Sequence, residues 1–369
     1  MGDLRSRVIH LADGQDRADA RNLRTGIIVG DEPIVPGGRF AELFRVAWTD
    51  LRRMLLSFTQ PGIAVVAVDT IRQRVAGTLA LAARVGRANA AIIGRHGHCD
   101  LYLHADPALA LRHLVLVAHP ISDTREVTYR LLDLRTRTAF ADEAGKRLEA
   151  LTASGPTFVR VGTYCLFLLP TGPDDAAGWP EEAAEAWKCV PERVYVEESE
   201  AEPDRWRRRK NRMQPATRGP LASGTGVVDP FDKARESVTM VRTSPGPSRA
   251  TITGVHDEPM IGSIMLTAGG RSETLKVGAS AVKTGVLVGR YERCDTHGAS
   301  VLAHHGISRV HVLVLDIDGA LYAIDTGSTN GIYLGRLGRE KEEVRIAALA
   351  AGAELVLGDD LARMEWRPG

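Results

Sequence analysis

The sequence predicts an all-β protein in which two related β-sandwiches are joined by a long, largely disordered linker, with an amphipathic helix before the first sandwich. Three observations support this fold class. The chain contains an internal repeat, its apolar runs are short and bounded by turn residues, and a stretch rich in Gly, Pro, Ser and Thr separates the two repeats. Many short apolar runs at such spacing are typical of a sandwich or barrel of about 100 residues.

The first predicted element is a helix at about 39–58, within an N-terminal extension at 1–60. Apolar side chains recur there at the spacing of one helix face, at Phe40, Leu43, Phe44, Ala47, Leu51, Met54, Leu55 and Phe58. Pro and Gly residues bound this segment on both sides. Two interpretations stay open: the helix packs on the first sandwich, or it binds a partner and supports homo- or hetero-assembly.

The internal repeat defines a first copy at 62–170 and a second copy at 259–369. Each copy has an apolar triplet, then Gly-Arg, three variable residues and Cys-Asp, followed by a histidine that precedes an apolar run and by an apolar pair ending in Asp. A late glycine closes the pattern, 68 positions after Gly94 (at Gly162) and 69 after Gly289 (at Gly358). Chance does not readily produce this many matches in one order, so we interpret the chain as carrying a duplicated domain.

Residues 171–258 are predicted to form a mostly disordered linker, with one short helix expected at 179–189. An acidic run at 197–204 is followed by a basic run at 205–212, and the remainder is rich in Gly, Pro, Ser and Thr. A basic run beside an acidic run of similar length is typical of a solvated, self-compensating segment. Contact of the basic run with RNA, lipid or an acidic partner is the alternative.

Composition limits the classes of function. Lys and Arg number 47 against 46 for Asp and Glu, and this balance argues against binding of nucleic acid along a broad basic face. Apolar runs stay short of the roughly 18–20 residues of a membrane-spanning helix, and residues 1–24 lack the apolar segment of a secretory signal. Four cysteines do not make a disulfide scaffold and fit a reducing compartment, so we expect a cytoplasmic protein.

Polar residues of the second copy gather at three strand ends. Gly289-Arg290 ends one predicted strand, 308–311 (Ser-Arg-Val-His) opens the next, and 325–331 (Asp-Thr-Gly-Ser-Thr-Asn-Gly) follows a third. Strand-end loops of a sandwich gather at one pole, so these segments are expected to converge. Their guanidiniums, hydroxyls, carboxamide and loop N–H groups suit an anion with several acceptor oxygens. Ser308 and His311 would face opposite sides of a strand, which argues against proton transfer between them.

In this order and spacing, the three motifs resemble the forkhead-associated (FHA) domain over residues 260–368. That family is an eleven-stranded β-sandwich that binds phosphothreonine peptides. The resemblance implies that Arg290 and Ser308 bind the phosphate, that Thr329 adds a further phosphate contact, and that Asn330 hydrogen-bonds the peptide backbone. Arg309 occupies a position that contacts the phosphate or the peptide backbone in the family.

The same resemblance implies structural roles for four further residues. Gly289 and His311 would hold the loops in place, and Gly327 and Gly331 would permit the turns of the third loop. Taken together, the resemblance implies that the protein is a non-catalytic adaptor without cofactor or metal. Its partner would be a phosphothreonine-containing protein modified by an upstream bacterial Ser/Thr kinase.

The first copy departs from the pattern. It keeps Gly94-Arg95 and His113, but Ala110 and Leu111 stand where Ser308 and Arg309 stand, and its third loop reads Arg-Thr-Arg-Thr-Ala at 135–139. We interpret it as a degenerate FHA-like domain without a phosphothreonine site, serving protein–protein contact. Capture of another anion is the alternative, through Arg95, Arg135 and Arg137.

Parts of the sequence also fit three alternative functions. Asp325-Thr326-Gly327 also matches the signature of aspartic proteases, which need two apposed carboxylates, so this alternative requires a homodimer. Clusters of His and Cys near 96–104 and 294–305 raise the possibility of a metal site, but their spacings match no structural zinc pattern. The third alternative is a structural subunit of a larger assembly with a vestigial phosphopeptide site.

The linker also contains a candidate self-ligand. Segment 236–245 vaguely resembles the short phosphorylated tail that some bacterial FHA proteins fold back onto their own site, with Thr239 and Thr243 as the candidate phosphorylated residues. An ordinary Ser/Thr-rich linker is the alternative. A flexible tether of about 20–40 residues would give an effective concentration in the millimolar range.

Overall fold

The computed structural model describes residues 7–10, 40–122, 126–136, 138–172, 178–200, 249–252, 258–335 and 341–369. Both copies belong to one compact unit. The candidate self-ligand residues Thr239 and Thr243 and the acidic and basic runs up to residue 212 lie outside the described residues, apart from the backbone of residues 197–200.

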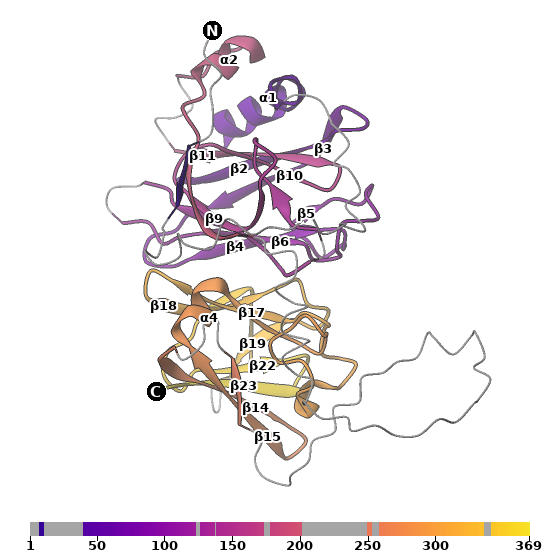
Figure 1. Ribbon diagram of the computed structural model, residues 1–369, viewed down its shortest axis with the longest axis vertical. Helices are drawn as coiled ribbons and strands as arrows, with labels where there is room; N and C mark the ends of the chain where they lie inside the picture. Colours follow the sequence, from indigo (N-terminus) through magenta and orange to yellow (C-terminus); the bar gives the residue numbers. More distant parts are fainter. Residues whose placement is uncertain are drawn as a thin grey trace, which may run out of the picture. The chain divides into compact units, whose positions relative to one another are not determined.

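The first copy is a β-sandwich built from one continuous sheet that folds over itself (Figure 1). The strand order is β3-β2-β11-β10-β8-β9-β7-β6-β4-β5. The strands are β2 Gly62–Asp69, β3 Arg74–Ala82, β4 Asn89–Gly94, β5 Leu101–Tyr102, β6 Leu114–Ala118, β7 Tyr129–Asp133, β8 Phe140–Ala141, β9 Arg147–Ala153, β10 Thr157–Val161 and β11 Tyr164–Thr171. Alternate side chains of these strands fill a shared core that includes Val65, Leu116 and Leu166.

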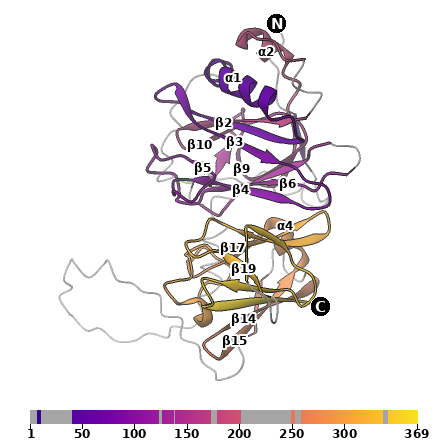
Figure 2. The ribbon, with the colours of Figure 1, turned by 180° about the vertical axis from the view of Figure 1, so that it is seen from behind.

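The predicted N-terminal helix forms as α1, Phe40–Ser57. It lies on the outer face of strands β2 and β11, where Phe44, Trp48 and Leu51 pack against Val66 and Phe167 (Figures 1 and 2). The apolar face of α1 is therefore used inside the protein, as the first of the two interpretations predicted. None of the helices in the described part of the chain is long and apolar enough to cross a membrane.

Regular structure continues beyond residue 170, where the sequence placed the start of the linker. The helix α2, Ala183–Cys189, contacts α1, and Trp48 donates a hydrogen bond to the carbonyl of Glu181. The strand β12, Val194–Glu200, pairs with β9 and with β1, Arg7–His10. The predicted boundary was set too early because polar and charged residues dominate this segment, while its few apolar side chains, such as Tyr195, are buried in the core.

The second copy is a two-sheet sandwich. One sheet has the order β13-β15-β14-β23-β22-β19-β20 and the other the order β16-β17-β18-β21. The strands are β13 Arg249–Ile252, β14 Met260–Ala268, β15 Arg271–Gly278, β16 Val286–Val288, β17 Val312–Ile317, β18 Ala320–Asp325, β19 Ile332–Gly335, β20 Glu342–Val344, β21 Ile346–Ala348, β22 Glu354–Leu357 and β23 Ala362–Pro368. Two short helices complete it, α4 Ala279–Thr284 and the 3-10 turn η3 Ser300–Leu302.

Equivalent strand faces of the two copies pack against each other. One apolar cluster joins Ile92, Val115, Val117 and Leu132 of the first copy to residues at matching positions in the second, Leu287, Leu313, Leu315 and Ile324. Strand β6 is apolar on both faces, and so is β17 apart from Asp316, which is typical of strands covered on both sides.

Two reciprocal ion pairs border this interface between the copies. Arg135 of the first copy pairs with Asp295 of the second at 2.5 Å. Arg345 of the second copy pairs with Asp100 of the first, also at 2.5 Å. Because Asp100 and Asp295 occupy matching positions of the repeat, the contact has an approximate internal two-fold character.

Candidate functional site

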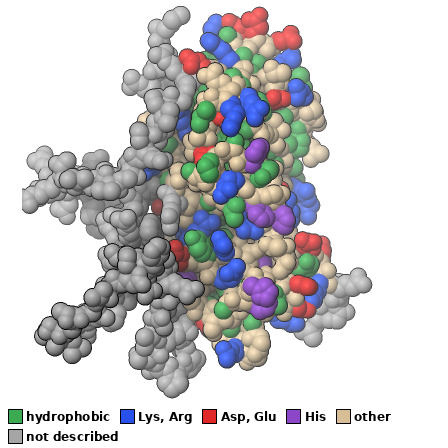
Figure 3. Space-filling view, turned by 90° about the vertical axis from the view of Figure 1, so that its right-hand side faces the viewer, with side chains coloured by type: hydrophobic (Ala, Val, Ile, Leu, Met, Phe, Trp, Pro, Cys, Tyr) green, Lys and Arg blue, Asp and Glu red, His purple; other side chains and the backbone are tan. Residues whose placement is uncertain are grey.

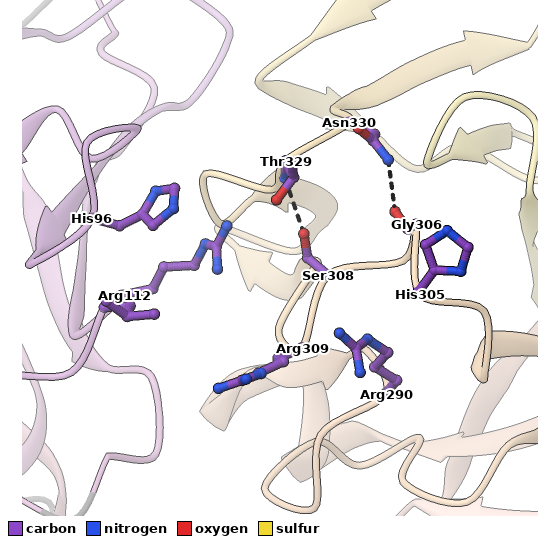
Figure 4. A pocket seen from close by; sticks show the side chains of 10 residues that line it. His96, Arg112, Arg290, His305, Gly306, Ser308, Arg309, Thr329 and Asn330 are labelled. Atoms are coloured by element: carbon purple, nitrogen blue, oxygen red, sulfur yellow. Dashed lines mark hydrogen bonds between the residues drawn. The ribbon is translucent and has the colours of Figure 1, made fainter.

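A pocket of about 350 Å³ lies where the three polar loops of the second copy meet (Figure 4). Its lining includes all five side chains that the sequence predicted to bind phosphopeptide: Arg290, Ser308, Arg309, Thr329 and Asn330. The remaining lining residues are His305 and Gly306 of the second copy and His96, Leu111 and Arg112 of the first copy. The structure thus brings the predicted residues together in one place.

The first loop is shaped by a close backbone approach at Gly289. A Cβ atom at this position would lie 2.4 Å from the carbonyl oxygen of Arg309, so a side chain does not fit there. Gly289 also donates its N–H to Thr296 Oγ1 at 2.9 Å. The next residue, Arg290, is exposed and donates from Nε to the carbonyl of Ile307 at 2.8 Å, which ties its guanidinium to the second loop.

The second loop is organised by the buried ring of His311. Its Nδ1 accepts a hydrogen bond from the Ser308 N–H at 3.0 Å, and its Nε2 donates to the carbonyl of Gly331 at 3.0 Å. The ring thereby links the second and third loops. Burial lowers the pKa of His311, so the neutral ring that these hydrogen bonds require is favoured.

The contact between His311 and Ser308 differs from the sequence-based expectation. The spacing predicts that both residues lie on one strand with opposite orientations, whereas β17 begins only at Val312 and both residues lie in the preceding loop. They are hydrogen-bonded through the Ser308 backbone N–H rather than its hydroxyl. The Ser308 hydroxyl instead accepts a hydrogen bond from the Thr329 N–H at 3.0 Å.

The third loop turns through two glycines in the left-handed region, Gly327 with φ 75° and Gly331 with φ 68°. Between them, Thr329 is exposed, and Asn330 donates from Nδ2 to the carbonyl of Gly306 at 3.0 Å. Figure 4 shows the hydrogen bond of Thr329 to Ser308 and that of Asn330 to Gly306 on the same side of the pocket.

Charge at the pocket is strongly asymmetric. Three guanidiniums and two imidazoles line it, and no carboxylate is among the lining residues in the described part of the chain. Within the same described residues, neither Arg290 nor Arg309 has a carboxylate at ion-pair distance. Figure 3 shows a face of the molecule on which several histidine side chains lie near Lys or Arg side chains. Such a lining favours an anionic ligand.

The carboxylate of the protease-like motif and a thiol of the candidate metal cluster both take part in local hydrogen bonds instead. Asp325 Oδ1 accepts the Ser328 N–H at 2.8 Å, an arrangement that shapes the turn. Cys294 is buried, its thiol donates to the Arg309 carbonyl, and burial raises its pKa to about 12. In the described part of the chain, no three His, Cys, Asp or Glu side chains come together as metal ligands.

The first copy repeats the hydrogen bonds of this scaffold. His113 Nδ1 accepts the Ala110 N–H at 3.0 Å, and its Nε2 donates to the Thr138 carbonyl at 2.7 Å. Arg95 Nε donates to the Leu109 carbonyl at 3.1 Å, and Cys99 donates to the Leu111 carbonyl. Burial lowers the pKa of His113 to about 4.

Of the three arginines of the alternative anion site in the first copy, the structure describes Arg95 and Arg135. Arg135, one of its three predicted arginines, is instead paired with Asp295 across the interface. Arg137 lies outside the described residues, and Arg95 points its Nε at a backbone carbonyl.

Sequence reasoning missed the contribution of the first copy to the pocket. The sequence marks His96 only as a candidate metal ligand, and Leu111 only as a position where the second copy has an arginine. Arg112 gave no signal, because its partner in the repeat is the apolar Val310.

The FHA domain family model matches residues 286–358, which contain all three loops and the five predicted binding residues. This segment of the chain is therefore similar to FHA domains.

Solved FHA domains resemble part of the chain. The first FHA domain of Rv1747 from Mycobacterium tuberculosis is 27% identical, with 30% of this chain and 98% of that chain covered and a TM-score of 0.23. The FHA domain of CT664 from Chlamydia trachomatis is 21% identical, with 29% and 96% covered and a TM-score of 0.23. The yeast Dun1 FHA domain, solved with a doubly phosphorylated peptide, is 18% identical, with 34% and 82% covered and a TM-score of 0.23. A search of curated proteins finds no match.

Proposed function

We propose that the second copy captures phosphothreonine peptides and that the protein acts as a non-catalytic adaptor in Ser/Thr-kinase signalling. The observation that carries this proposal is that all five predicted binding residues line one pocket: Arg290, Ser308, Arg309, Thr329 and Asn330. Among the described residues that line this pocket, none is Asp or Glu. In this proposal the first copy contributes protein–protein contact, and a kinase upstream supplies the phosphorylated partner.

The loops provide a distinct group for each part of the ligand. The Arg290 guanidinium and the Ser308 hydroxyl bind the phosphate, and the exposed Thr329 adds a third contact. Asn330 already has its carboxamide held by Gly306, so its remaining donor and acceptor capacity is oriented for a peptide backbone. Arg309 is exposed and lines the same pocket, where it neutralises part of the ligand's charge.

The expected energies suit a phosphorylation-dependent switch. A phosphothreonine carries about −1.5 to −2 charges near neutral pH. A hydrogen bond to a charged group contributes roughly 1.5–3 kcal/mol, and a micromolar dissociation constant corresponds to about 8 kcal/mol. A few such contacts therefore account for most of a micromolar affinity, and removal of the phosphate abolishes it.

The test is a pull-down with the full chain from a degenerate phosphothreonine peptide library, followed by titration of the selected peptide. Wild type should bind the phosphorylated form only. Arg290→Ala should lose most of the affinity, and Arg95→Ala, the equivalent substitution in the first copy, should retain it. Failure of the library to bind wild type, or equal binding by Arg290→Ala, would overturn the proposal and favour a structural role with a vestigial site.

A further inference from the structure

The wall of the pocket opposite Arg290 belongs to the first copy. His96, Leu111 and Arg112 line it, and they come from the first-copy loops that match the two phosphate-binding loops of the second copy (Figure 4). The approximate two-fold contact between the copies explains this placement, because it brings equivalent loops of the repeat towards each other. The first copy has lost its own binding residues there, yet these loops border the pocket of the second copy.

Arg112 connects the first copy directly to the ligand-binding third loop. Its side chain is buried, and its Nε donates to the Gly327 carbonyl at 2.8 Å, with Nη2 donating to the same oxygen. Nearby, His98 Nδ1 lies 3.4 Å from the Ser328 carbonyl oxygen. The loop that presents Thr329 and Asn330 is therefore held from both copies.

The groups of this wall that are left to bind a ligand include a positively charged guanidinium. The structure shows no hydrogen bond to Arg112 Nη1 within the described residues, and the Arg112 guanidinium lines the pocket. His96 lies in the same wall, where burial and, to a smaller extent, the neighbouring Arg112 lower its pKa, so the neutral ring is favoured and serves as a hydrogen-bonding group. Together with Arg290 and Arg309, the pocket holds three guanidiniums, more positive charge than one phosphothreonine neutralises.

We infer that the phosphopeptide pocket is composite, and that the wall from the first copy binds a second anionic group of the same peptide, next to the phosphothreonine. This inference rests on the proposed function and specifies its substrate class: a phosphothreonine with an acidic neighbour. The anion is a carboxylate or a second phosphate, since the Arg112 guanidinium pairs with the negative charge, and the neutral His96 ring donates to the acceptor oxygens, that both groups share.

The test begins with the peptides selected by the degenerate phosphothreonine library, randomised on both sides of the phosphothreonine. Selection of an acidic residue at a fixed position is expected. The affinity of the full chain is then compared for the acidic peptide and for its amide counterpart, Glu→Gln or Asp→Asn, with an expected preference of about tenfold for the acid. A third peptide with a phosphorylated residue at that position distinguishes the two anions, because phosphate should bind more tightly than carboxylate if it is the natural group.

The variants use Leu111, because it lies in the same wall and is 39% exposed, so its substitution leaves the core intact. Leu111→Glu should reduce the preference for the acidic peptide by about five- to tenfold, and Leu111→Lys should increase it. Arg95→Ala, which changes a first-copy arginine outside the pocket, should leave the preference unchanged.

The outcomes separate this inference from the proposed function. If no phosphopeptide binds, or if Arg290→Ala binds like wild type, the proposed function itself fails. If wild type and Arg290→Ala behave as proposed but the acid and amide peptides bind equally, the composite pocket is wrong. The same conclusion follows if both Leu111 variants leave the preference unchanged.

Discussion

The polar loops of the two copies are built on the same hydrogen bonds but present different side chains. In both, a buried histidine accepts a loop N–H, an arginine Nε donates to a carbonyl, and a cysteine thiol donates to another carbonyl. Where the second copy presents Ser308 and Arg309, the first presents Ala110 and Leu111. Buried groups therefore maintain the loop scaffold in both copies, whereas the ligand chemistry depends on a few side chains that line the pocket.

The largest expected effect is on stability, and it follows from substitutions that disrupt the loop scaffold in either copy. Gly289→Ala would place a Cβ 2.4 Å from the Arg309 carbonyl oxygen, and Gly94→Ala would place one 2.5 Å from that of Leu111. Because the clashing atoms are backbone, each substitution should lower the free energy of unfolding by roughly 2–4 kcal/mol. Chemical denaturation measures this. A small effect at Gly94 alone would show that the first copy no longer needs its scaffold.

The next largest effect is on phosphopeptide affinity, from a substitution that removes a binding group and leaves the loop scaffold intact. Ser308→Ala reproduces the side chain of Ala110 in the second copy and should reduce phosphopeptide affinity by about 10- to 100-fold, the loss of one charge-assisted hydrogen bond. Calorimetric titration gives the affinity, and thermal unfolding checks that the fold is retained. The matched variant Ala110→Ser should create no second binding site, because the first copy lacks the other loop residues. A stoichiometry of two peptides per chain for that variant would contradict the comparison.

A smaller effect is expected at the ion pairs between the copies. Arg135→Ala should lower the free energy of unfolding by roughly 1–3 kcal/mol, because it leaves the buried Asp295 carboxylate without this pair. Arg345→Ala should change it by less than about 1 kcal/mol, because that arginine is mostly exposed to solvent. Denaturant titrations of both variants measure the difference. Equal effects would show that the two pairs contribute symmetrically despite their different burial.

The smallest predicted effect concerns pH. Burial lowers the folded-state pKa of His311 below its unfolded value of about 6.5, so the unfolded state binds more protons below that pH. The stability that neutral His311 contributes is therefore present above about pH 6.5 and lost as the pH falls below it. His311→Gln should show a shallower loss of unfolding free energy on acidification than wild type. If the unfolding free energies of the two proteins fall in parallel as the pH is lowered, His311 is not the source of the loss of stability.

Much of this organisation follows from the sequence because it depends on local patterns. The i, i+3, i+4 spacing identified α1, and the ordered motifs identified the repeat and the five side chains that line the pocket. The turns at Gly327 and Gly331 follow from the conformational freedom of glycine.

What the sequence did not reveal depends on contacts between distant segments. The wall formed by Leu111 and Arg112 requires knowledge of how the two copies pack, and a pairwise comparison of the repeat identifies Arg112 only as a replacement for valine. One signal was present: β6 is apolar at every position and β17 at every position except Asp316, which indicates that both faces of these strands are covered. The identity of the covering element was not encoded locally.

The most direct test of the proposed phosphothreonine site is an NMR titration of the full chain with the library-selected phosphothreonine peptide. The account predicts large amide shifts at Arg290, Ser308, Thr329 and Asn330 and unchanged resonances at Arg95. Shifts centred on Arg95, or no shifts at the four second-copy residues at a saturating peptide concentration, would contradict it.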